Sequence, residues 1–372
     1  MQVAPGDRAG GRWRKRLALA LVLLIVAVGG IEILLRLQPG LLPEDAAIRL
    51  FWRALEDSGG LGSVASEEVA YRMPASVEGR IQAGRIDFSY RTDPYGFRNP
   101  SPWPPRADIL VLGDSLAFGF GVDDEHGWVA QLDRRLPEHR VVNLGILAAA
   151  PQQYLMAYEA HGARLAPELI LVALYPPNAL GAVADFDRWV AAGEPERLDL
   201  WRVRRNRDDL LAPLRQALRR SHLLSGLYFA GKDGHTLGFA DGGRVRLAAA
   251  EVAGVAPVAR AGAPQFERII ELLTRLERLG DAAGAQLLVV LFPSKWEALE
   301  PLLGRPAPAL VAPFVERFDE LGIQYLDLTP VLRRRSAGGE RLFFEIDVHP
   351  NVAGYRVIGE VIAEHLSHHV LN

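Results

Sequence analysis

Hydrophobic positions fall into short β-branched runs that alternate with amphipathic stretches. The clearest run is Ile109–Leu112, which stops at Gly113-Asp114-Ser115. An apolar run of this length, ended by glycine, is typical of a buried strand in a parallel sheet. The same pattern recurs along the chain. We expect strands at 108–112, 140–143, 169–174, 286–291 and 324–327, and helices at 127–135, 152–163, 265–279, 310–321 and 353–366.

This alternation predicts an α/β fold with three layers, in which helices cover both faces of a central parallel sheet of about five strands. We assign residues 106–372 to this domain. The pattern is interrupted at about 179–262, which is too long for a plain loop. Arginines cluster there at 202–207 and 215–220. They fit a solvated helix face, a subdomain that recognises an anionic polymer, or a surface that rests on lipid headgroups.

The N-terminal pattern is different because Leu17–Leu35 is apolar apart from Glu32. At 1.5 Å per residue, this segment makes about 22–28 Å of helix, which is enough to cross a membrane. Basic residues precede it, so the positive-inside rule places residues 1–16 in the cytoplasm and the rest of the chain outside. A cleaved signal peptide is the alternative. No small-x-small cleavage site follows, and we favour an uncleaved anchor at residues 17–35.

Residues 36–105 form a membrane-proximal region and linker with weak periodicity. Pro43–Leu55 could be a short helix beside the membrane. Asp93-Pro94-Tyr95-Gly96-Phe97-Arg98 is an aromatic turn with one arginine, and Ser101–Pro105 is a stiff spacer before the first strand.

Composition changes this picture little. The chain has 372 residues, of which 49% are hydrophobic and 23% charged, with a net charge of -3. This composition indicates a globular protein, and the charge gives no case for a nucleic-acid partner. Cysteine is absent, which excludes disulfides and thiolate catalysis. No clustered histidine and carboxylate set at useful spacing indicates a metal, and no motif indicates a cofactor.

Side chains suited to acyl transfer follow several of the predicted strands. Ser115 is the candidate nucleophile, because catalytic groups of open α/β sheets lie beyond the carboxyl ends of the strands. His349 is the candidate base, and Asp347, two residues earlier, could orient its imidazole. Read alone, Gly-Asp-Ser also fits an ordinary strand-to-helix turn, and Asp-x-His-Pro fits a capped helix start.

Two further strand ends offer donors for an oxyanion. Gly145 follows the second strand and could present a backbone N–H, while Asn178 follows the third strand and could present its amide. Each also fits a turn residue, but all these elements fall at carboxyl ends of strands in one predicted sheet.

Gly113-Asp114-Ser115, Gly145, Asn178 and Asp347-x-His349 resemble, in that order, the four blocks of the SGNH/GDSL hydrolase superfamily. The resemblance covers about residues 106–368 without the insertion. It implies a flavodoxin-like SGNH hydrolase fold, a Ser115-His349-Asp347 triad, and an oxyanion hole made by Ser115, Gly145 and Asn178. The Asp-x-His spacing resembles the alginate O-acetyltransferase-like branch. Phe292-Pro293-Ser294-Lys295 and the Tyr95–Arg98 turn also resemble membrane-anchored bacterial members.

The resemblance implies a serine esterase or O-acyltransferase that needs no cofactor and acts on ester-linked acyl groups, such as acetyl, of a glycan or lipid. With the anchor, it implies a single-pass protein of the bacterial inner membrane whose catalytic domain is periplasmic. The alternative is an inactive glycan-binding or scaffold protein of the cell envelope. The sequence does not decide the acyl group, the acceptor or the oligomeric state.

Overall fold

The computed structural model describes residues 8–38, 41–42, 46, 50, 62–83, 86–99, 103–204, 220–230, 235–247 and 255–370. Two compact units divide the chain. The first contains Met1–Ala54 and Arg207–Lys232, and the second contains Leu55–Asn206 and Asp233–Asn372. The predicted helix at 43–55 falls almost wholly outside the described residues, as do most of the arginines at 202–207 and 215–220.

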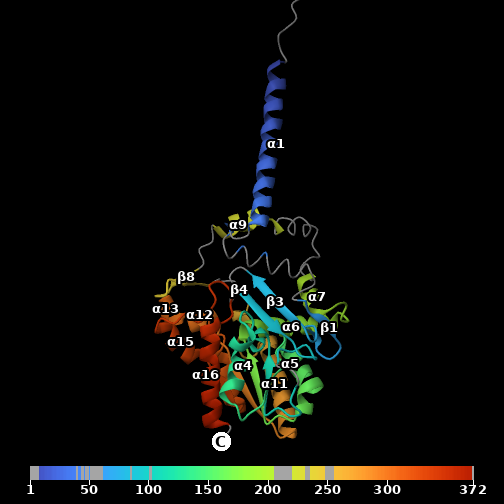
Figure 1. The fold of residues 1–372 in the computed structure, drawn as a ribbon, viewed down its shortest axis with the longest axis vertical. Coiled ribbons are helices and arrows are strands. Elements are labelled where there is room, and N and C mark those ends of the chain that lie inside the picture. The colour runs from blue at the N-terminus through green and yellow to red at the C-terminus, as the bar shows by residue number, and fades with distance from the viewer. Residues whose placement is uncertain are drawn as a thin grey trace, which may run out of the picture. The chain divides into compact units, whose positions relative to one another are not determined.

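The second unit is built on a five-stranded parallel sheet, which confirms the predicted fold class (Figure 1). Its order is β11-β10-β7-β5-β6, which reads 2-1-3-4-5 in chain order from the β6 edge and is therefore flavodoxin-like. The central strands are fully buried, because their side chains meet helices on both faces. The strands are β5 (Ile109–Gly113), β6 (Val141–Asn143), β7 (Leu169–Leu174), β10 (Gln286–Leu291) and β11 (Tyr325–Asp327).

Helices flank the sheet in two packed groups (Figure 1). In one group, α4 (Trp128–Arg135) packs against α16 (Val352–His369). In the other, α5 (Pro151–Ala157) and α6 (Pro176–Ala191) pack against α11 (Pro264–Ala282). The remaining predicted helix is α14, Ala312–Leu321. All five predicted helices are present, and α5 continues into a π-helical turn at Tyr158–Gly162.

Three two-stranded antiparallel hairpins were not predicted. Their strands are only three to six residues long, too short to give a clear period. They pair β1 (Val64–Ser66) with β2 (Ala70–Arg72), β3 (Glu78–Ala83) with β4 (Ile86–Arg91), and β8 (His235–Gly238) with β9 (Arg244–Leu247).

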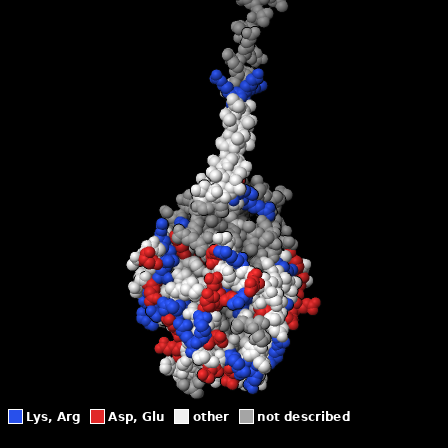
Figure 2. All heavy atoms as spheres, viewed as in Figure 1, with Lys and Arg blue, Asp and Glu red and all other residues white. Residues whose placement is uncertain are grey.

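The first unit contains the N-terminal helix α1 (Arg8–Leu37) and the short helix α9 (His222–Ala230). Within α1, Trp13–Leu37 is long and apolar enough to cross a membrane by length and composition, and none of its most apolar stretch is buried. Figure 2 shows that most of this length carries no charged side chains and that basic side chains lie at the end nearer the N-terminus.

Candidate active site

Ser115 lies at the carboxyl end of β5, where the strand turns directly into the short helix α3 (Ser115–Phe118). The Asp114 carboxylate caps this helix by accepting the N–H of Leu116 at 3.0 Å. A side chain at Gly113 would place its Cβ 2.9 Å from the Cβ of Ala173 on the neighbouring strand, so the turn needs glycine. Because β5 lies between β6 and β7, Ser115 sits at the topological switch point of the sheet.

The structure brings His349 and Asp347 to this serine. The His349 Nε2 atom lies 2.7 Å from the Ser115 Oγ atom, and Nδ1 lies 2.5 Å from the Asp347 Oδ1 atom. The same oxygen accepts the backbone N–H of His349 at 2.9 Å, which fixes the carboxylate beside the ring. Asn351 then caps α16 by accepting the N–H of Gly354. A hydroxyl, an imidazole and a carboxylate thus form one continuous relay.

Burial and charge set the protonation of the two carboxylates. Burial alone would raise the pKa of Asp347, but His349, its two hydrogen bonds and the charge of Lys295 together hold that pKa below the usual value. Burial raises the pKa of Asp114, despite hydrogen bonds from Leu116 and Asn178. Asp347 is therefore the carboxylate suited to stabilise a charged imidazolium at His349.

Gly145 does not present its N–H to the serine. That N–H donates to the Asn143 Oδ1 atom at 2.8 Å and is buried. The residue is glycine for a different reason, since a Cβ there would lie 2.5 Å from the backbone nitrogen of Phe118 on α3. The structure therefore does not support the expected oxyanion role of Gly145, which instead allows α3 to approach closely.

Asn178 lies beside the serine, in the first turn of α6, but its amide is engaged. The Nδ2 group donates to the Asp114 Oδ2 atom at 2.7 Å and to the Ala149 carbonyl at 3.1 Å. One amide thus joins the turn at Asp114 to the loop after β6. In this arrangement Asn178 holds two loops together and has no hydrogen left for an oxyanion.

Sequence reasoning missed Ala148 in that loop. Ala148 is exposed and adopts a left-handed backbone conformation with φ 55°. Among the described residues, no acceptor pairs with its N–H. Tyr71 donates to the carbonyl of Leu147 at 2.9 Å, and Arg202 donates to the carbonyl of Ala148 at 2.7 Å. An alanine among three carries no sequence signal for such a conformation.

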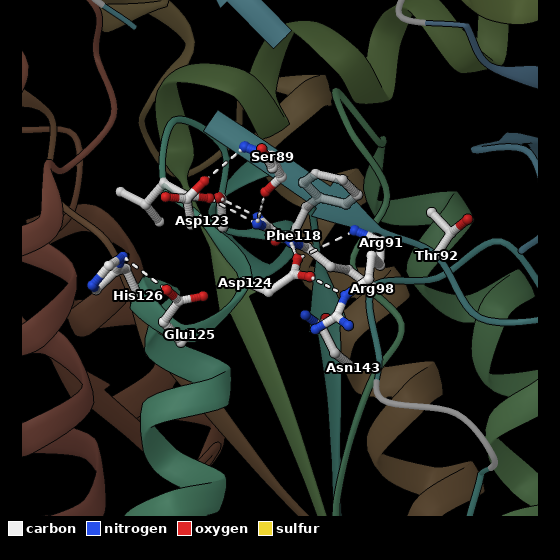
Figure 3. A network of polar contacts seen from close by, with 12 residues as sticks. Ser89, Arg91, Thr92, Arg98, Phe118, Asp123, Asp124, Glu125, His126 and Asn143 are labelled. Atoms are coloured by element: carbon white, nitrogen blue, oxygen red, sulfur yellow. Dashed lines mark hydrogen bonds and ion pairs between the residues drawn. The ribbon is translucent and has the colours of Figure 1, made fainter. Parts of the chain in front are cut away.

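The aromatic turn of the linker supports helix α3. The Arg98 guanidinium donates to the carbonyls of Phe118 and Gly119, which end α3, at 3.1 and 2.7 Å. It also pairs with Asp124 at 2.6 Å, and the exposed Arg91 on β4 contacts the same carboxylate (Figure 3). The turn therefore fixes the loop that follows the serine.

One group of possible metal ligands lies near this loop. Among the described residues, Asp123, Glu125 and His126 have ligand atoms within 4.8 Å of one another (Figure 3). The sequence did not indicate this group. Asp123 already accepts the N–H of Ser89 at 2.7 Å, and we assign the group no role.

Ser115 lies at the switch point of a flavodoxin-like sheet and contacts His349, which in turn contacts Asp347, so this is the candidate site of a serine ester hydrolase. The chain belongs to the GDSL-like lipase/acylhydrolase family, whose model matches residues 111–357. No curated protein matches the chain significantly.

Several solved structures are similar. A lipolytic G-D-S-L family member from Veillonella parvula is 15% identical, with a TM-score of 0.37 over 70% of this chain and 98% of that one. A GDSL-like lipase from Bacteroides thetaiotaomicron is 12% identical, with a TM-score of 0.35 over 70% and 87%. The acetyl xylan esterase AlAXEase is 10% identical, with a TM-score of 0.38 over 69% and 99%.

Proposed function

We propose that this protein is a membrane-anchored, extracytoplasmic serine esterase or O-acyltransferase in which Ser115, His349 and Asp347 form the catalytic triad. The observation that carries the proposal is the continuous contact from Ser115 Oγ to His349 Nε2 and from His349 Nδ1 to Asp347. Its substrates would be ester-linked acyl groups, such as acetyl, on a glycan or lipid.

The relay supports a double-displacement reaction. Ser115 Oγ attacks the ester carbonyl while His349 Nε2 accepts the hydroxyl proton, and Asp347 stabilises the imidazolium. The tetrahedral intermediate collapses, the C–O bond to the alcohol breaks, and His349 gives its proton to that alcohol. Water then attacks the acyl-enzyme in an esterase, whereas a sugar hydroxyl attacks it in a transferase. In both cases His349 accepts the attacking proton and returns it to Ser115.

We also propose that the oxyanion is received by the N–H groups of Ser115 and Ala148, in place of the expected Gly145. Ser115 begins α3, and no acceptor among the described residues pairs with its N–H. The Asn178 amide donates to both Asp114 and Ala149, and these two hydrogen bonds hold together the loops that carry the N–H groups of Ser115 and Ala148. The Asn178 amide could also donate to the oxyanion only if it released Asp114 or Ala149.

The proposed location depends on α1. Trp13–Leu37 could span a bilayer, and Arg14, Lys15 and Arg16 precede its apolar core. The positive-inside rule then supports an extracytoplasmic catalytic unit. Substrates outside the cytoplasm favour envelope or exported glycans, and the anchor keeps lipid esters within reach.

The test is hydrolysis of a p-nitrophenyl ester series by the full-length chain, together with labelling by a fluorophosphonate probe. Ser115→Ala and His349→Ala should each reduce kcat by several orders of magnitude, because triad members act as a unit. Ser89→Ala and His126→Ala, which alter an exposed serine and a partly exposed histidine outside the relay, should remain active. Wild-type turnover that survives Ser115→Ala would refute the nucleophile. An inactive, unlabelled wild type would instead favour the scaffold alternative.

A further inference from the structure

Helix α9 is an apolar helix that exposes leucine side chains. His222–Ala230 reads His-Leu-Leu-Ser-Gly-Leu-Tyr-Phe-Ala and contains no Asp, Glu, Lys or Arg. Leu224 and Leu227, three residues apart on one helix face, are 41% and 62% exposed. Two exposed leucines are not unusual by themselves, and what distinguishes α9 is the element to which it is attached.

The N-terminus of α9 is bound by an acidic residue of α1. The Glu32 carboxylate accepts the hydroxyl of Ser221 at 2.9 Å and the backbone N–H groups of His222 and Leu223 at 3.0 Å each. An anion at this position satisfies unpaired N–H groups and interacts favourably with the helix dipole. Glu32 is also the one acidic residue in the apolar stretch of α1.

The contact lies on one face near the end of α1. Gly29, Glu32 and Leu35, spaced by three residues, are partly covered, whereas the residues around them are exposed. The helices α1 and α9 pack together within the same compact unit (Figure 1). A carboxylate with four hydrogen bonds, including one from Arg36 at 2.9 Å, makes this a specific attachment.

Length places this attachment at the membrane surface. The 25 residues of Trp13–Leu37 make about 37 Å of helix, whereas a hydrocarbon core is about 30 Å thick. The end of α1 that holds Glu32 therefore reaches the boundary between acyl chains and headgroups. Arg36 and Arg220, both exposed, lie beside the contact, where anionic headgroups would attract them.

We infer that α9 is an interfacial helix whose Leu224–Leu227 face lies in the headgroup boundary of the bilayer that α1 crosses, with Glu32 holding its N-terminus there. This inference rests on the proposed anchoring and extends it. Apolar helices of this kind enter the interface about 5–10 Å deep. The chain then contacts lipid through two elements far apart in sequence, which would fix part of the insertion at the membrane surface.

The absence of cysteine makes the test direct. Leu227→Cys in the full-length chain is labelled with an environment-sensitive fluorophore, and the protein is placed in phosphatidylcholine and phosphatidylglycerol nanodiscs. We expect the label to lose most of its fluorescence when lipids with a quencher near the headgroup replace the ordinary ones. The matched controls are Leu24→Cys within α1 and Leu321→Cys on α14, which are 59% and 44% exposed.

Leu24→Cys should be quenched by lipids with a deep quencher, and Leu321→Cys should not be quenched. If Leu24→Cys is quenched but Leu227→Cys is not, the inference fails while the anchor stands. If neither is quenched, both the anchor and the inference fail. Equal quenching of Leu321→Cys would also overturn the inference, because the label would then report nonspecific lipid contact. Adding Glu32→Gln should reduce quenching at position 227 and leave position 24 unchanged.

Discussion

Lys295 is a charged residue with no exposed surface. Burying an ammonium group is costly unless hydrogen bonds replace its water. Here its Nζ atom lies 2.9–3.4 Å from five backbone carbonyl oxygens. These belong to Arg246, Phe344, Glu345, Ile346 and Asp347. The ammonium therefore fixes the loop that carries the proposed acid and base, and ties it to β9.

Replacing this residue should affect both the position and the charge of the relay. In Lys295→Met the carbonyls lose their donor, and a misplaced relay lowers kcat on the order of a hundredfold while KM changes little. The lost positive charge raises the pKa of Asp347, which Lys295 helps to lower. Because the relay needs an ionised Asp347, the acid limb of kcat/KM should move to higher pH. The titratable side chains around the relay that bear on this shift are Asp347, Asp114, Lys295 and Tyr355.

Glu297→Gln is the matched control for stability. Glu297 is also a buried charged residue, and its carboxylate accepts the N–H groups of Leu310 and Val311 without contacting the relay. The Glu297→Gln variant should lower the midpoint temperature of unfolding without moving the acid limb of kcat/KM. Two outcomes would contradict a positioning role for Lys295. One is an equal shift of the acid limb in both variants, and the other is a loss of stability in Lys295→Met with no change in kcat or in the acid limb.

At the scale of elements, Arg98 links the linker turn and β4 to the end of α3. Its guanidinium is 6% exposed and also donates to the carbonyls of Ser89 and Val122 at 3.1 and 2.7 Å. A planar group with five donors can serve all these acceptors, whereas a lysine ammonium has three donors and a different shape.

Arg98→Lys should therefore destabilise the second unit by about 2–4 kcal/mol, because several buried acceptors lose their donors. Denaturant unfolding followed by tryptophan fluorescence measures this loss. Arg91→Lys is the control, since Arg91 pairs with the same Asp124 but is 69% exposed, and exposed pairs contribute little. An unchanged midpoint in Arg98→Lys would show that the turn does not support α3.

The parallel sheet and Ser115 at the carboxyl end of β5 could be predicted from the pattern of apolar runs. Asp347 and His349 could be predicted from their spacing, although they follow helix α15 (Thr329–Ala337) rather than the end of a strand, where we expected them. The hydrogen-bond partners of Gly145 and Asn178 could not. Whether an N–H is free depends on side chains that fold back locally, as Asn143 does onto Gly145. The carbonyl groups that surround Lys295 could not be predicted either, because they come from segments about 50 residues away in the sequence.

At the scale of the whole molecule, the family model covers the sheet and the relay but not α1. Family membership therefore supports the ester chemistry, while the proposed side of the membrane rests on the charges that flank the apolar stretch of α1. Basic residues lie before the apolar stretch of that helix, and its far end carries Glu32 and Arg36 as an ion pair. This asymmetry is the basis for the proposed extracytoplasmic location of the catalytic unit.

The orientation can be measured because any introduced cysteine is unique. In bacterial spheroplasts that carry the full-length chain, a membrane-impermeant maleimide should label Leu321→Cys on the catalytic unit. It should label Ala9→Cys, which precedes the apolar segment, only after the membrane is permeabilised. The reverse pattern would place the relay in the cytoplasm and favour cytosolic acyl esters. Labelling of both sites in intact spheroplasts would mean that α1 does not cross the membrane.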